Sequence, residues 1–111
     1  MSDLENLIGH FQLQNQQLQT LLMQKQALTI QSKEIEKALD HVESSKGDVY
    51  RTVGPLLVKS SATDVKKQLE DEKEDIDIKL KSIEMQEKKI KDKLKESQEK
   101  IQNLMPQGQG G

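Results

Sequence analysis

The chain has 111 residues, of which 32% are apolar, 32% are charged and only 2% are aromatic. A compact domain is nearer half apolar, so this composition argues against a single-core globule and favours long helices with a narrow apolar seam. The 17 basic and 19 acidic residues leave a net charge of −2, which lacks the positive excess of a nucleic-acid-binding protein. The chain contains no Cys, which excludes disulfides, thiolate metal sites and a cysteine nucleophile.

The sequence also indicates the cellular compartment in which the chain is expected. No apolar run approaches the roughly 20 residues needed to cross a bilayer. The acidic start, Met1 to Glu5, differs from the positively charged start of a secretory signal peptide. We therefore expect a cytoplasmic protein with neither nucleic acid nor a membrane as a partner.

A first helix is predicted over about residues 3–45. Ser2 or Asp3 can cap its start, and Gly47 can stop it in the left-handed conformation. Nine of twelve positions spaced alternately by three and four residues are apolar, which is typical of a coiled coil. This seam comprises Leu4, Leu7, Phe11, Gln14, Leu18, Leu21, Lys25, Leu28, Ser32, Ile35, Leu39 and Val42.

The segment from about 48 to 60 predicts a β-hairpin. Two short runs rich in β-branched and apolar residues flank Gly54-Pro55. Pro55 presets its own φ, and Gly54 accepts a positive φ beside it, as a tight turn requires.

A second helix is predicted over about residues 62–105, with Ser61 or Thr63 as its cap and Asp64 in its first turn. Eight of eleven seam positions are apolar. This seam comprises Leu69, Lys73, Ile76, Leu80, Ile83, Glu87, Ile90, Leu94, Ser97, Ile101 and Leu104. Residues 106–111 have nothing to bury, so we expect a disordered tail.

Chain reversal at the hairpin predicts a mostly α fold. The two helices form one long antiparallel coiled coil joined by the central β-hairpin, in a single domain of residues 1–105. If the turn centres between residues 54 and 55, Leu4 faces Met105 and Ile8 faces Ile101. Both termini then lie at the end far from the hairpin, about 60 Å away by helix rise.

An isolated hairpin is marginal in water and has two open edges. We therefore expect the hairpins of several chains to associate; the alternative is that the hairpin packs only on its own helix ends. The residues of this expected assembly surface are Val49, Tyr50, Val53, Gly54, Pro55, Leu56, Leu57 and Val58.

The far end of the coiled coil carries a second apolar cluster. Helix ends fray, so these side chains are expected to be exposed part of the time; a functionless terminal layer is the alternative. The residues are Leu4, Leu7, Ile8, Phe11, Ile101, Leu104 and Met105. Further apolar residues off the seam widen the apolar surface of the helices: Leu13, Leu22, Met23, Ile30, Ile78 and Met85.

Nothing in the sequence predicts catalysis. His10 and His41 lie far apart on one helix, and the acidic run from Glu70 to Asp77 is interpreted as a solvated helix face. Gly54-Pro55 is not part of a phosphate-binding loop. We expect no catalytic residues, no metal and no cofactor.

The whole pattern resembles the β-type subunits of the prefoldin family, in their archaeal form. Arms of equal length flank Val49-Tyr50-Arg51 and the run from Val53 to Lys59, and the resemblance extends from about Leu4 to Met105. One hairpin instead of two is typical of the β type and not of the α type.

The resemblance implies a heterohexamer of two α and four β subunits, whose hairpins build β-barrels. It also implies a chaperone that holds unfolded client proteins at the coiled-coil tips without ATP and passes them to a group II chaperonin. The assembly surface would then be Val49 to Lys59, and the far apolar cluster would bind clients. The alternative function is a structural coiled-coil scaffold that tethers one defined partner.

Overall fold

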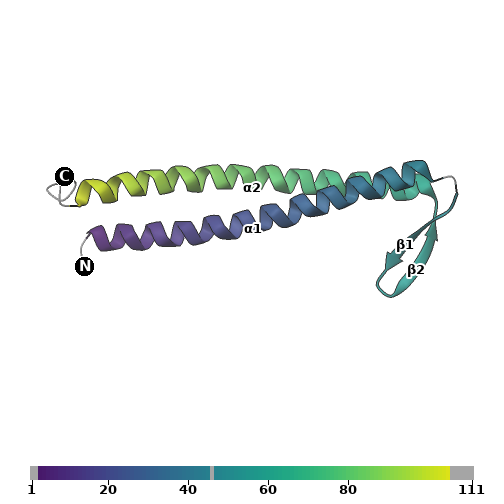
Figure 1. The fold of residues 1–111 in the computed structure, drawn as a ribbon, viewed down its shortest axis with the longest axis horizontal. Coiled ribbons are helices and arrows are strands. Elements are labelled where there is room, and N and C mark those ends of the chain that lie inside the picture. The colour runs from purple at the N-terminus through teal and green to yellow at the C-terminus, as the bar shows by residue number, and fades with distance from the viewer. Residues whose placement is uncertain (1–2, 46, 106–111) are drawn as a thin grey trace. The chain divides into compact units, whose positions relative to one another are not determined.

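The computed structural model describes residues 3–45 and 47–105, which form two helices and two strands. In chain order these are α1 (Asp3–Ser44), β1 (Val49–Val53), β2 (Leu56–Ser60) and α2 (Ala62–Leu104). The predicted fold class is confirmed: two long helices are joined by a central antiparallel β-hairpin (Figure 1). The expected tail at 106–111 and the expected cap at Ser2 lie outside the described residues.

The chain divides into two compact units, and the interpretation of residues 1–105 as one domain stays a prediction. The first unit, here called the terminal unit, joins Met1–Lys25 with Ser82–Gly111. The second, the hairpin unit, is Gln26–Lys81. In each unit a stretch of α1 runs antiparallel beside a stretch of α2, and the hairpin unit also contains β1 and β2 (Figure 1).

Burial follows the predicted seams. Every seam position of α1 is buried or half-buried, and so is every seam position of α2 except Leu104. The apolar side chains that are most buried are Leu21 and Ile83 in the terminal unit, and Ile35, Val65 and Ile76 in the hairpin unit. Each of these five is still 7–9% exposed, because two helices alone cannot surround a side chain.

Polar seam residues in the terminal unit pair with one another across the helices. Ser97 Oγ donates to Gln14 Oε1 at 3.2 Å, and Lys25 Nζ donates to Glu87 Oε1 at 3.1 Å. Pairing about the turn centre would instead place Lys95 opposite Gln14, so this pairing is shifted by two residues from the expected one. The reason is that Ser97 lies in the seam and Lys95 does not. The interdigitation of seam side chains determines which residues of the two helices lie opposite each other.

The hairpin has the predicted turn. Val53 pairs with Leu56 and Val49 with Ser60, so Gly54 and Pro55 alone form the loop. Gly54 has a φ of 59°, and the proline ring holds Pro55 near −65°. A positive φ at only the first loop residue defines a type II′ turn, whose twist matches that of paired strands.

The helix ends inside the chain agree with one expectation and correct another. The backbone N–H of Asp64 donates to Ser61 Oγ at 3.1 Å, so Ser61 caps α2 as predicted. The left-handed stop at Gly47 is wrong, because among the described residues Gly54 is the glycine with positive φ. Instead α1 ends at Ser44, whose Oγ donates to the His41 carbonyl at 3.1 Å.

Candidate assembly and binding surfaces

The hairpin carries several exposed large apolar side chains within one short stretch of the chain. Leu56 and Leu57 are 64% and 66% exposed, and Tyr50 is 61% exposed. Val53 and Val58 are also exposed, whereas Val49 is half-buried. Within the described residues each strand pairs only with the other, so both outer edges carry unpaired backbone groups.

The two faces of the hairpin differ because strand side chains alternate. One face carries Arg51 and its cross-strand partner Val58, and the other carries Thr52 and its partner Leu57. Arg51 donates through Nη1 to Gln68 Oε1 and through Nη2 to Glu72 Oε1, the latter at 3.0 Å. The face that carries Arg51 is therefore turned toward α2.

A groove of about 760 Å³ lies beneath the hairpin. Apolar side chains from both helices form much of its lining, and Arg51 and Glu72 also line it. The apolar members of that lining are Ala38, Val42, Val49, Tyr50, Val65 and Leu69. The expectation that the hairpin packs only on its own helix ends therefore describes Val49, but not the exposed residues nearer the turn.

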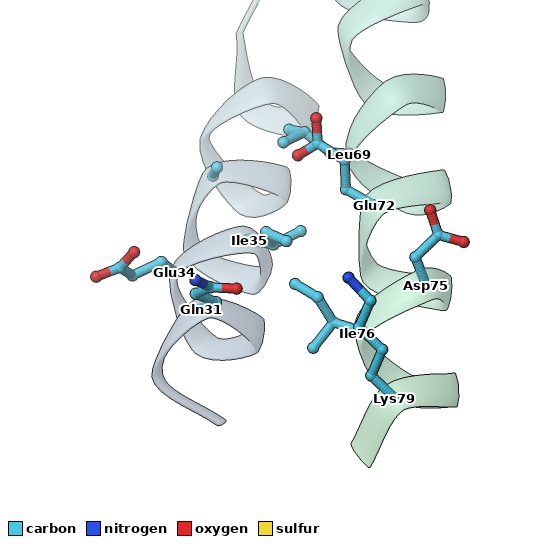
Figure 2. A pocket seen from close by; sticks show the side chains of 9 residues that line it. Gln31, Glu34, Ile35, Leu69, Glu72, Asp75, Ile76 and Lys79 are labelled. Carbon is cyan, nitrogen blue, oxygen red and sulfur yellow. The ribbon is translucent and has the colours of Figure 1, made fainter. Parts of the chain in front are cut away.

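A second hollow of the hairpin unit lies between α1 and α2 (Figure 2). Ile35 and Ile76 extend toward each other across it, while Glu34 and Asp75 point outward on opposite sides. Carboxylates that point apart into solvent cannot act as an acid–base pair on one substrate. This hollow is a gap in seam packing without the convergent polar groups of a catalytic site.

The terminal unit contains the predicted client-binding residues, and the structure separates them by exposure. Leu4, Leu7, Phe11 and Ile101 are half-buried in the seam. The exposed members are Ile8 at 39%, Leu104 at 51% and Met105 at 51%. A groove of about 450 Å³ on this unit is lined by Asp3, Asn6, Leu7, His10, Lys100, Asn103 and Leu104. Leu7 and Leu104 thus share this groove with polar and charged side chains.

Glu87 is the acidic seam residue of the terminal unit. Its Oε2 accepts from Lys91 Nζ at 2.7 Å, and its Oε1 accepts from Lys25. These hydrogen bonds, that from Lys91 first and that from Lys25 second, hold the pKa of Glu87 below its usual value. The side chain is only 13% exposed, so the two lysines neutralise a charge that the seam partly covers.

Residues 3–45 and 47–105 contain neither a metal-binding cluster nor a helix able to span a membrane. No group of three or more His, Cys, Asp or Glu side chains in that part of the chain could hold a metal ion. Neither described helix is long and apolar enough to span a membrane.

Comparison with known proteins identifies the family. A profile described as "Prefoldin subunit" matches residues 5–108, which is nearly the whole chain. The chain belongs to the prefoldin family. This is a family of chaperone subunits and not of enzymes.

Solved and curated prefoldin subunits give the same result. The crystal structure of the prefoldin beta subunit from Thermococcus strain KS-1 has a TM-score of 0.88 and 36% identity, and the match covers 96% of each chain. The prefoldin subunit beta of Thermococcus kodakarensis is 42% identical over 57 residues, and that of Methanosarcina acetivorans is 40% identical over 60 residues. In these curated matches the chain spans about half the length of each relative, 49% and 51% respectively.

Two structurally important residues of this prefoldin chain were not singled out by sequence reasoning. Val65 is buried, and its spacing of four residues before Leu69 could have extended the second seam to include it. Arg51 was part of the family resemblance but had no predicted role. No local pattern identifies its partners, because Gln68 and Glu72 lie 17 and 21 residues further along the chain.

Proposed function

We propose that this chain is a β-type subunit of an ATP-independent chaperone that holds unfolded proteins. The observation that carries the proposal is the exposure of Ile8, Leu104 and Met105 in the terminal unit of a prefoldin-family chain. Unfolded proteins share exposed apolar side chains and little else. Apolar burial is non-directional, so an apolar surface can accept chains of unrelated sequence.

Assembly would occur through the hairpin. Association with another hairpin would remove the exposed apolar surface of Tyr50, Leu56 and Leu57 from water. The free strand edges can also accept further strands. The expected partners are other β-type chains and a prefoldin α subunit, in a heterohexamer of two α and four β subunits. Hairpins that complete a closed barrel leave no edge unpaired.

Client capture would be multivalent. The tip residues Leu4, Leu7, Ile8, Phe11, Ile101, Leu104 and Met105 offer a small apolar area in each subunit. Several copies that engage one unfolded chain give an avidity that exceeds any single contact. Weak individual contacts also allow release, which transfer to a group II chaperonin in the cytoplasm requires. No nucleotide, metal or other cofactor enters this mechanism.

Light scattering of diluted, chemically unfolded clients tests the proposal. The chain is mixed with a prefoldin α subunit from an archaeal relative, and the assembled complex is added to two unrelated clients. We expect near-stoichiometric complex to suppress the aggregation of both. Protection of neither client would overturn the holdase proposal and favour a coiled-coil scaffold that tethers one defined partner.

A further inference from the structure

Arg51 differs from the other residues of the hairpin because it bonds to a helix. Its guanidinium bonds to Gln68 and Glu72, which are four residues apart and so lie on one face of α2. The two donors Nη1 and Nη2 each reach a different acceptor. A fixed planar fork can meet two acceptors one helical turn apart, whereas a lysine ammonium is a single point charge.

These bonds tie a sheet that has few other attachments. Val49 is the half-buried residue at the start of β1, while the residues from Tyr50 to Lys59 are exposed. The four-residue connection before β1 contains Gly47, and a single residue, Ser61, joins β2 to α2. Without Arg51, the remaining attachments of the hairpin are its covalent connections, the half-buried Val49 and Ser60, and the ion pair of Lys59 with Asp48 at 3.0 Å.

We infer that Arg51 is a positioning residue for assembly: through Gln68 and Glu72 it fixes the angle between the hairpin and α2. This inference rests on the proposed function, in which hairpins of several prefoldin subunits associate. The bonds hold one face of the hairpin toward α2 and leave Leu57, on the opposite face and 66% exposed, free to meet a neighbouring hairpin. A hairpin ordered in advance loses less conformational freedom when it associates.

The Arg51–Glu72 pair is partly exposed, with side-chain exposures of 42% and 46%, so its removal has a moderate effect. We expect Arg51→Ala to weaken association with a prefoldin α subunit by about fivefold, the upper range for an exposed ion pair. Arg51→Lys should recover part of that loss, and Glu72→Gln should lose less than Arg51→Ala. Lys66→Ala is the matched control, since its ion pair with Glu43, 45% and 55% exposed, joins the two helices of the same unit.

Association is measured by sedimentation at low salt and at about 1 M salt, with helix content checked by circular dichroism. Screening at high salt should reduce the difference between wild type and Arg51→Ala. The inference is overturned if Arg51→Ala and Glu72→Gln both associate like wild type, or if Lys66→Ala weakens association equally. A wild-type chain that does not associate at all would instead contradict the proposed function.

A second measurement separates positioning from stability. The chain has no Cys, so Thr52→Cys and Glu74→Cys place one spin label on the hairpin and one on α2. In the unassembled subunit we expect a narrow distance distribution for wild type and a broad one for Arg51→Ala, with unchanged helix content. A distribution that stays narrow in Arg51→Ala overturns the inference.

Discussion

Replacement of Ile76 by Ala removes apolar surface from the seam, while the same change at Ile78 removes it from the outer surface of α2. Ile76 is 9% exposed and Ile78 is 59% exposed, and the two residues lie on one helix in one unit. Transfer of the lost methylene groups is worth about 0.8 kcal/mol for each group that is fully buried. The cavity left at Ile76 adds to that loss.

The expected change in the free energy of unfolding therefore differs between the two sites. At Ile76 a transfer and cavity loss of about 2.5 kcal/mol is offset by about 0.4 kcal/mol from the better helix propensity of Ala. We therefore expect Ile76→Ala to destabilise by about 2 kcal/mol, or to lower Tm by roughly 10 °C. At Ile78, which is 59% exposed, a transfer loss of about 1 kcal/mol is partly offset by the same propensity gain, so we expect a change of only about 0.6 kcal/mol.

Thermal unfolding followed by circular dichroism at 222 nm measures both variants at equal subunit concentration. The comparison isolates burial, because the residue type, the helix and the substitution are the same. Equal losses at the two sites would refute the assigned seam. A larger loss at Ile78 would indicate that the outer surface of α2 is covered by another chain.

Three further predictions concern the hairpin, the acidic seam residue and the α2 cap. Leu57→Asp should prevent assembly and leave most helix content, because a charge enters the apolar interface on the face opposite Arg51; an unchanged size by light scattering would contradict this. Glu87→Gln should lower Tm above about pH 4.5, where Glu87 is charged and pairs with its lysines. The difference in Tm from wild type should vanish as pH falls through the lowered pKa of Glu87, because the protonated side chain no longer forms these pairs. A Tm difference that grows below about pH 4 would contradict this prediction. Ser61→Ala should cost about 1 kcal/mol in thermal unfolding, because the N–H of Asp64 loses its acceptor, and Ser61→Asp should retain most of that stability.

Sequence periodicity was sufficient to predict the helices and the seam. Alternating spacings of three and four residues place one stripe of side chains between two helices, whatever the connection between them. Gly54 and Pro55 were enough for the turn, since each restricts φ in the sense that a tight hairpin needs. These features are local, and local geometry determines them.

Features that depend on contacts between distant segments were predicted less well. Counting from the turn centre placed Lys95 opposite Gln14, but in the structure Gln14 pairs with Ser97. The angle at which the hairpin meets α2 depends on Arg51, and side-chain alternation says nothing about that angle. At the tip, the sequence placed Phe11 and Leu104 together, yet Phe11 is half-buried and Leu104 is exposed.

The most direct test of the account removes the tip residues from the assembled complex. A chain that lacks residues up to Gln12 and after Gln98 keeps Leu21, Ile83 and the Lys25–Glu87 pair of the terminal unit, and all of the hairpin unit. Assembled with a prefoldin α subunit, it should match the size of the full-length complex but no longer suppress the aggregation of two unrelated clients. Full protection by the truncated complex would show that clients bind elsewhere and would contradict the account.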